Sequence, residues 1–119
     1  MIYGGAGDDS IDADLNTKSY GSIMFGNDIV YAGEGDDTVY GGSGDDLIFG
    51  DEGDDSLYGQ AGEDIIYGGS GEDFINSGEG WDTIFGGDGC DSIYTYGGGD
   101  VVWLGDCGPV DGGKIVVGD

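Results

Sequence analysis

The sequence predicts an all-β repeat protein, and two observations predict it. The first is a strict period of nine residues along most of the chain. The second is the order within each period, where glycines come first, an aspartate follows, and three mostly apolar residues come last. A unit this short cannot bury an apolar face by itself, so successive units must stack on one another. With 119 residues, the chain forms at most one domain.

Three columns define the repeat, in the register G-G-x-G-x-D-x-U-x, where U is a large aliphatic residue. They agree over nine consecutive registers, so we do not attribute the pattern to chance. Position six is Asp28, Asp37, Asp46, Asp55, Asp64, Asp73, Asp82, Asp91 and Asp100. Position four is Gly26, Gly35, Gly44, Gly53, Gly62, Gly71, Gly80, Gly89 and Gly98. Position eight is Val30, Val39, Ile48, Leu57, Ile66, Ile75, Ile84, Ile93 and Val102.

The pattern weakens at both ends of the chain. An earlier copy contains Gly7, Asp9 and Ile11, and "MIY" at the start fits the last three places of the copy before it. Asp9 and Asp28 are 19 residues apart, so residues 13–22 read as one degenerate copy with a one-residue insertion. After Trp103 the period stops, and the remaining segment contains the only proline and a strand-like "KIVV". We therefore expect a repeat module over residues 1–103 and a C-terminal cap over residues 104–119.

Charge narrows the choice of partners. The chain carries 26 acidic residues, two basic ones and no histidine, for a net charge of −24. It has almost nothing with which to neutralise phosphate, so it should bind neither nucleic acid nor anionic membranes. No run approaches the roughly 18 apolar residues that a membrane span needs, which argues against membrane insertion. The expected partners are cations.

The nonapeptide resembles the RTX, or haemolysin-type, calcium-binding repeat, over about 100 residues from Met1 to Trp103. The resemblance implies a right-handed parallel β-roll, a two-sheet β-solenoid with calcium in its turns. In this family the first six residues of each copy form a turn and the last three form a short strand. Successive strands alternate between the two sheets, so one coil takes eighteen residues. The resemblance also implies a protein that is secreted or displayed on the cell surface.

The residue types suit calcium. Glycine reaches positive φ without steric cost, and the short aspartate keeps its oxygens at the turn. Calcium takes six to eight oxygen ligands, whereas zinc prefers cysteine and histidine. We expect the Asp column and the backbone of the position-four glycines from Gly26 to Gly89 to supply those oxygens. The alternative is that the aspartates only form Asx-turns without metal, which would leave stacked carboxylates repelling one another.

Stacking predicts which aspartates share an ion, because turns two copies apart lie about 4.8 Å from each other on one edge. The ion would take carboxylates from both turns, which predicts about seven or eight Ca²⁺ ions. One edge pairs Asp28 with Asp46, Asp46 with Asp64, Asp64 with Asp82, and Asp82 with Asp100. The other edge pairs Asp37 with Asp55, Asp55 with Asp73, and Asp73 with Asp91. Asp9 with Asp28 is a weaker eighth pair, because Ile23 and Met24 replace the leading glycines of that turn.

Positions seven and nine should point outward, and the eighteen-residue phase separates the two sheets. One outer face is nearly continuous in apolar residues, and the other is mixed. We name the first face the apolar panel. Its residues are Ile29, Tyr31, Leu47, Phe49, Ile65, Tyr67, Phe85, Val101 and Trp103. Such a patch usually marks a surface for a neighbouring domain or for self-association, although aromatic ladders also stabilise stacked strands by themselves.

Two cysteines lie near the end of the repeats. Cys90 occupies position five of its turn, and Cys107 follows seventeen residues later, one short of a coil. The two therefore fall on neighbouring coils at one edge, near the separation that a disulfide tolerates in an oxidising compartment. The alternative is a pair of free thiols.

These features favour a protein that is not an enzyme, because it has no histidine and no serine–base arrangement. The thin core and 30 glycines predict a chain that is disordered without calcium and folds on binding it. The leading hypothesis is a calcium-triggered module that supports the secretion and stability of a larger extracellular protein. The alternative is a self-assembling surface-layer, matrix or filament subunit that stacks through the open "MIY" end and the apolar panel. An adhesive or ice-binding solenoid is disfavoured, because a regular Thr or Asn ladder is missing.

Overall fold

A computed structural model describes residues 1–7, 10–12, 26–107 and 114–118, and every element in these ranges is a β-strand. None of the described residues belongs to a helix that could cross a membrane. The first six strands are β1 (Ile2–Ala6), β2 (Ser10–Asp12), β3 (Ile29–Glu34), β4 (Thr38–Ser43), β5 (Leu47–Glu52) and β6 (Ser56–Ala61). The others are β7 (Ile65–Ser70), β8 (Phe74–Glu79), β9 (Thr83–Asp88), β10 (Ser92–Tyr96), β11 (Val101–Trp103) and β12 (Lys114–Gly118).

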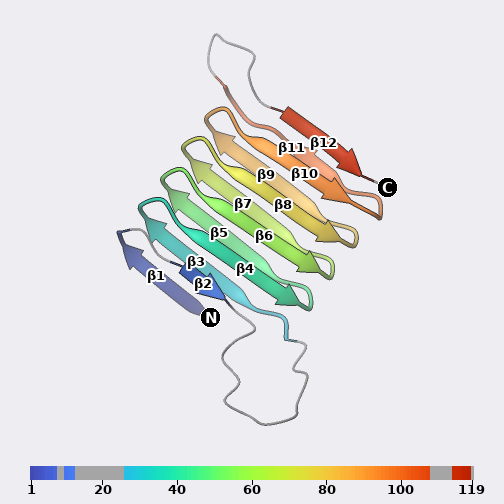
Figure 1. The fold of residues 1–119 in the computed structure, drawn as a ribbon, viewed down its shortest axis with the longest axis horizontal. Helices are drawn as coiled ribbons and strands as arrows, with labels where there is room; N and C mark the ends of the chain where they lie inside the picture. Colours follow the sequence, from blue (N-terminus) through green and yellow to red (C-terminus); the bar gives the residue numbers. More distant parts are fainter. Residues whose placement is uncertain (8–9, 13–25, 108–113, 119) are drawn as a thin grey trace.

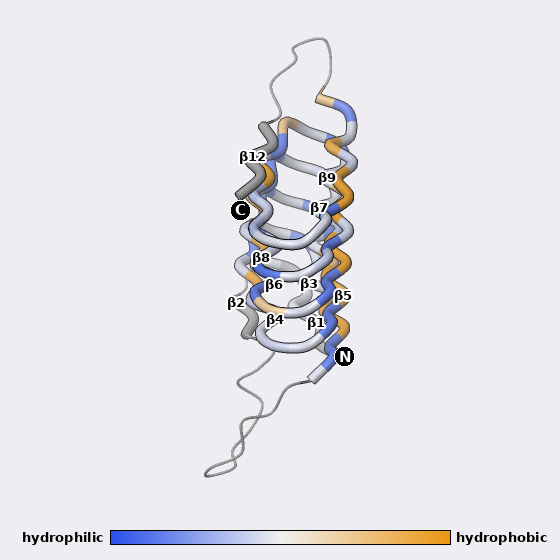
Figure 2. Tube along the Cα trace, turned by 90° about the vertical axis from the view of Figure 1, so that its right-hand side faces the viewer, coloured by the Kyte–Doolittle hydropathy of each residue, from blue (hydrophilic) through white to orange (hydrophobic). Residues whose placement is uncertain are grey.

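The strands form two parallel sheets that face each other (Figures 1 and 2). The odd sheet has the order β1-β3-β5-β7-β9-β11, and the even sheet has the order β2-β4-β6-β8-β10-β12. The chain thus changes sheet after every strand, and paired positions such as Ile48 and Ile66 are one coil apart. The predicted two-sheet solenoid with about eighteen residues per coil is confirmed.

The strands are longer than the family resemblance implies. Most have six residues, and they run through the last three positions of one repeat and the first three of the next. In β5 and β7 the pairing continues from Phe49–Tyr67 to Asp51–Gly69 and Glu52–Ser70. The reason is that a residue with positive φ at position two, such as Gly69 at 119°, bends each strand without ending its pairing.

The core is a column of aliphatic side chains between the sheets, with Ala32 buried beside it. Every described position-eight residue from Val30 to Ile93 is fully buried, and Val102 packs against the end of the column. Alternate side chains along a strand point to opposite faces, so the residues on either side of this column are more exposed. The prediction that position eight fills the core is confirmed.

The first two strands pair across an interruption of the period. β1 pairs directly with β3, and β2 pairs with β4, although more chain separates them than the usual eighteen residues. Ser10 lies opposite Thr38, so β2 takes the place in the even sheet directly before β4. The predicted Asp9–Asp28 pair stays a prediction, because Asp9 and the degenerate copy at 13–22 lie outside the described residues.

The strand-like "KIVV" does form a strand. β12 pairs in parallel with β10 at the edge of the even sheet, with Ile115 opposite Ile93. It thus continues the register of the repeats beyond the last periodic copy. The assignment of residues 104–119 as a separate cap stays a prediction.

Candidate metal centre

The aspartates of position six are buried as deeply as the core. Asp28 and Asp100, near the two ends, are half-buried. The other described members are at most 2% exposed: Asp37, Asp46, Asp55, Asp64, Asp73, Asp82 and Asp91. Burying a carboxylate is costly unless it is paired or neutralised, so each of these residues needs partners inside the turn.

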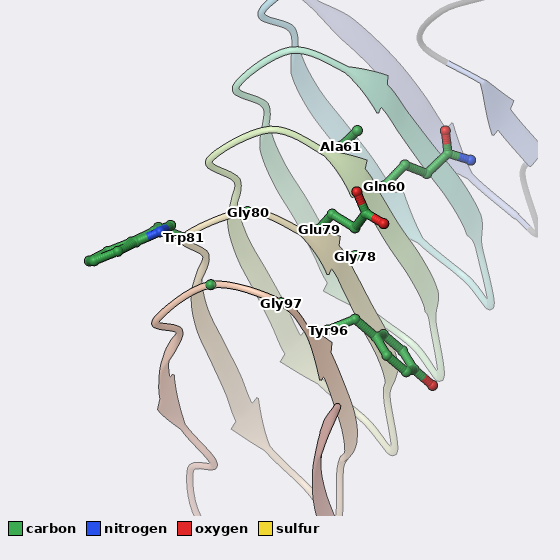
Figure 3. Close-up of a pocket in the computed structure, with 9 residues that line it drawn as sticks. Gln60, Ala61, Gly78, Glu79, Gly80, Trp81, Tyr96 and Gly97 are labelled. Carbon is green, nitrogen blue, oxygen red and sulfur yellow. The ribbon is translucent and has the colours of Figure 1, made fainter. Parts of the chain in front are cut away.

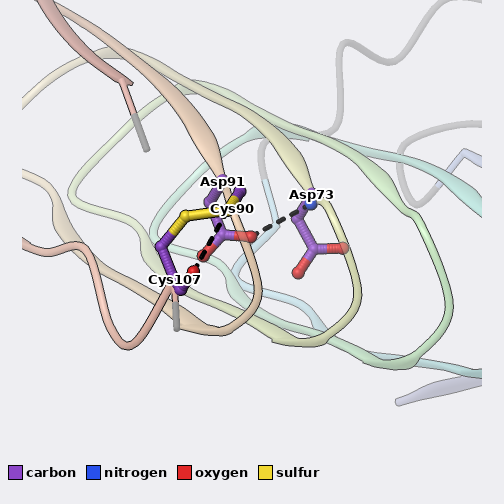
Figure 4. Close-up of a disulfide and its surroundings, with 4 residues drawn as sticks. All are labelled: Asp73, Cys90, Asp91 and Cys107. Atoms are coloured by element: carbon purple, nitrogen blue, oxygen red, sulfur yellow. Dashed lines mark hydrogen bonds between the residues drawn. A yellow bond between two sulfur atoms is a disulfide. The ribbon is translucent and has the colours of Figure 1, made fainter. Parts of the chain in front are cut away.

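One oxygen of each carboxylate holds the neighbouring coil. The Asp64 Oδ1 atom accepts a hydrogen bond from the backbone N–H of Asp46 at 2.9 Å, and Figure 4 shows the same bond from Asp73 to Asp91. Seven such bonds of 2.8–3.1 Å follow the seven pairs expected on the two edges: 28–46, 37–55, 46–64, 55–73, 64–82, 73–91 and 82–100. The structure therefore brings each of these pairs together, with the later carboxylate capping the backbone of the earlier turn.

The second oxygen is not used in this way. The Oδ2 atoms of five aspartates are buried without a hydrogen-bond partner: Asp55, Asp64, Asp73, Asp82 and Asp91. Native proteins rarely leave a buried polar atom unsatisfied, and such an atom points to an ion or a water molecule. A carboxylate oxygen in this position is suited to a cation.

The pKa values of these groups follow from their burial. Desolvation raises the pKa of Asp55 to about 6 and those of Asp64 and Asp73 to about 7. The backbone hydrogen bond lowers each pKa, and neighbouring carboxylates raise it further. Burial likewise raises the pKa values of Asp82 and Asp91. A divalent cation in the turn would reverse this balance, because it favours the ionised form.

In five turns the Oδ2 atom lies close to the first glycine of the turn, at a place that a side chain would fill. A Cβ atom added at Gly41 would lie 2.6 Å from Asp46 Oδ2 and 2.9 Å from the carbonyl oxygen of Gly59 in the next coil. The same convergence of an aspartate Oδ2 and a carbonyl oxygen recurs at Gly50, Gly59, Gly68 and Gly86. Carboxylate and carbonyl oxygens are calcium ligands, so the donor set fits calcium. We call these five spaces the glycine spaces.

The carboxylates alone do not form a cage. Among the described residues, no three acidic or cysteine side chains converge as metal ligands. The Oδ1 atom of the later aspartate in each described pair accepts a backbone N–H, which leaves its Oδ2 atom to face an ion. That two paired carboxylates share one ion stays a prediction, and backbone carbonyl oxygens would complete the ligands.

The two kinds of glycine have different roles. Position four was expected to contribute the turn backbone, and Gly44 there has a φ of 127° and meets the carbonyl group of Gly26 where a Cβ would lie. Position four thus lets neighbouring coils approach closely. The position-one glycines border the spaces beside the carboxylates, and the sequence prediction did not assign them a role. A glycine at position one in five of the nine registers was the available signal.

Cys90 and Cys107 form a disulfide in the structure, with Cα atoms 4.6 Å apart. It joins two neighbouring coils next to Asp91, beside the turn of Asp73 (Figure 4). Asp88 and Asp106, just before the two cysteines, form a parallel bridge between the same coils. The cross-link therefore lies where the periodic stack ends.

The apolar panel carries a continuous ladder of stacked rings. Tyr3, Tyr31, Phe49, Tyr67, Phe85 and Trp103 stack in order, with centroids 4.6–5.3 Å apart and interplanar angles of at most 10°. Beside the ladder, Ile65 is 39% exposed and Val101 is 46% exposed. Among the described residues of the even sheet, stacking is limited to Tyr40 and Tyr58, because Asn76 replaces the next ring. Phe74 and Tyr94 continue that column with tilted rings.

A separate groove lies on the even-sheet side of the turns (Figure 3). It is lined by residues that include Gln60, Glu79, Tyr96 and the exposed Trp81. The Trp81 ring also lies close to Gly99 of the next turn. This groove contains none of the position-six aspartates.

Comparison with known proteins identifies the family. The RTX calcium-binding nonapeptide repeat matches four stretches that cover most of the chain, namely residues 1–16, 24–57, 40–75 and 76–106. No curated protein and no solved structure matches the chain. The matched stretches contain the aspartate column and all five glycine spaces. The chain belongs to the RTX calcium-binding repeat family.

Proposed function

We propose that this chain is a non-catalytic calcium-binding module that folds when it binds Ca²⁺ outside the cell. It would thereby support the secretion and stability of a larger extracellular protein. One observation carries the proposal: Asp64 is fully buried, and its Oδ2 atom has no hydrogen-bond partner. The folded turn is incomplete without a cation.

Backbone groups of the neighbouring coils would hold the ligands of the ion in place. The backbone N–H of one coil orients the carboxylate of the next, as Asp46 does for Asp64. The position-one carbonyl group approaches the same space from the following coil, as Ser77 does beside Gly59. Bound calcium would supply positive charge to the buried carboxylates. The aspartates from Asp28 to Asp100 and the carbonyl groups of the turns are the residues that would hold it.

The free calcium concentration of each compartment would decide where the module folds. Where free calcium is low, folding must bury carboxylates that repel one another and lose their hydration. Where calcium is abundant, binding to the folded state alone stabilises it in proportion to the logarithm of the calcium concentration. The module would thus stay unfolded inside the cell and fold after export.

The test is the hydrodynamic size of the chain against free calcium, by light scattering at two protein concentrations. We expect an expanded chain that collapses to a compact monomer as calcium rises. Magnesium at the same ionic strength is the control, because it demands octahedral geometry and gives up its waters reluctantly. A size that does not respond to calcium would refute the proposal.

The apolar panel favours a second candidate function, self-association into a surface layer, matrix or filament. Its support is the continuous ring ladder together with the exposed side chains of Ile65, Tyr67 and Val101. In saturating calcium, sedimentation velocity of Tyr67→Ser and Tyr58→Ser compares position nine on the two sheets. Self-association predicts that wild type and Tyr58→Ser form large particles and that Tyr67→Ser stays monomeric. A monomeric wild type at all concentrations would exclude this function.

A further inference from the structure

The residue at position one is not the same in every turn. Glycine occupies it in the five glycine spaces, at Gly41, Gly50, Gly59, Gly68 and Gly86. Other residues take this position at Ala32, Ser77, Thr95 and Leu104. Each of these carries a Cβ atom at the place where the glycine turns leave the space beside Oδ2 open.

Ser77 is the clearest case. Its side chain is fully buried, and its Oγ atom has no hydrogen-bond partner of good geometry. It begins the turn of Asp82, whose Oδ2 atom is buried and unsatisfied in the same way. The Ser77 hydroxyl nevertheless lies near enough to lower the pKa of Asp82, against the larger upward effect of burial. A hydroxyl thus faces the carboxylate where the glycine turns have a space.

The next coil on that edge repeats the change. Thr95 is fully buried, its Oγ1 atom also lacks a partner, and it begins the turn of Asp100. This edge therefore runs from two glycine spaces, at Gly41 and Gly59, to two hydroxyl residues. The opposite edge keeps glycine at Gly50, Gly68 and Gly86. On that edge Ala32 precedes these three glycines and Leu104 follows them.

We propose that position one decides which turns bind calcium, with ions in the five glycine spaces and none in the Ser77 turn, where the side chain occupies the ion's place. This inference rests on the proposed calcium function. An ion needs six to eight oxygen atoms at 2.3–2.6 Å, and a Cβ atom in contact with the carboxylate leaves no room for it. The Ser77 carbonyl oxygen still faces the Gly59 space of the preceding coil, so Ser77 serves that space and closes its own.

The proposal lowers the number of ions that counting aspartates predicts. Of the seven described pairs, four have a glycine space between them: 46–64, 64–82, 55–73 and 73–91. The fifth space lies between Asp91 and the carbonyl oxygen of Leu104. The other three pairs, 28–46, 37–55 and 82–100, have Ile23, Ala32 and Ser77 at position one. The Ser77 and Ala32 turns would be held together without metal.

Native mass spectrometry of the full chain in calcium tests this inference by counting bound ions. Ser77→Gly removes the side chain from the closed turn and should raise the count by one. Ser70→Gly is the matched control, because Ser70 is exposed at position three and should leave the count unchanged. An unchanged or lower count for Ser77→Gly overturns the inference, and a lower count would mean that the hydroxyl is itself a ligand.

The reverse variant, Gly59→Ser, should lower the count by one. Circular dichroism in calcium shows whether that variant has folded, and the Ser77→Gly result decides the inference if it has not. A wild-type chain that binds no calcium refutes the proposed function itself. If wild type binds calcium but substitutions at position one leave the ion count unchanged, only this inference is refuted.

Discussion

Two columns of side chains fill the interior, and burial affects them in opposite ways. Ile66 at position eight and Asp64 at position six are two residues apart and equally buried. Burial stabilises the aliphatic column by about 25 cal/mol per Å² of apolar surface. The same burial raises the pKa of Asp64 to about 7 and leaves one of its oxygens unsatisfied. Burial therefore favours folding in the strands, whereas in the turns it opposes folding unless a ligand neutralises the carboxylates.

Calcium removal should have the largest effect on stability. It tests whether the two columns unfold together or independently. Each strand continues directly into a turn, so we expect chelation to unfold both. Hydrogen exchange should show that the amides of Ile66 and Asp64 lose protection together, by a factor of at least about 100, or about 2.7 kcal/mol. Protection that persists at Ile66 while it is lost at Asp64 would mean that the strands are stable by themselves.

A cavity in the aliphatic column should give the next largest effect. We expect Ile66→Ala to lower the free energy of unfolding by about 2–5 kcal/mol in saturating calcium, measured by urea denaturation. Ile65→Ala is the control, because Ile65 lies on the outer face of the same strand and is 39% exposed. Equal losses for the two variants would show that the column is not the core.

Removing one buried charge should change the free energy of unfolding, and the sign of that change should depend on whether calcium is present. Asp64→Asn keeps the shape of the side chain and the acceptor for the Asp46 N–H, but it removes the charge that burial disfavours. Without calcium the variant should be more stable than wild type, and with calcium it should be less stable by about 1–3 kcal/mol. Glu63→Gln, at an exposed position, is the control. A change of the same sign in both buffers would contradict the opposition between the columns.

Acidification should partly replace calcium in stabilising the folded chain, because it neutralises the buried aspartates. The pKa values of Asp64 and Asp73 rise from 3.8 to about 7, and that of Asp55 rises to about 6. The folded chain thus holds protons that the unfolded chain releases, so stability falls as pH rises from about 4 to 7 and is lowest above 7. Circular dichroism in chelator should show more β-structure at pH 5 than at pH 8. A loss of structure on acidification would contradict this prediction.

The nine-residue period predicted the core and the seven described aspartate pairs, because position alone decides which residues stack. It could not show that β1 pairs directly with β3, because the period is interrupted before Asp28. Nor could it separate the two glycines that begin some copies. Gly41 borders a carboxylate, whereas Gly42 has a φ of 107° and bends the strand. Only the arrangement of neighbouring coils distinguishes these roles.

The pairing of each strand only with strands one coil away has a further consequence. A structure in which every unit touches only its two neighbours behaves as a one-dimensional lattice, with a boundary energy wherever an ordered unit meets a disordered one. Asp64 belongs to two such contacts at once, because it caps Asp46 with its carboxylate and its own N–H is capped by Asp82. Order should therefore spread from coil to coil, and the steepness of the response to calcium should increase with the number of coils.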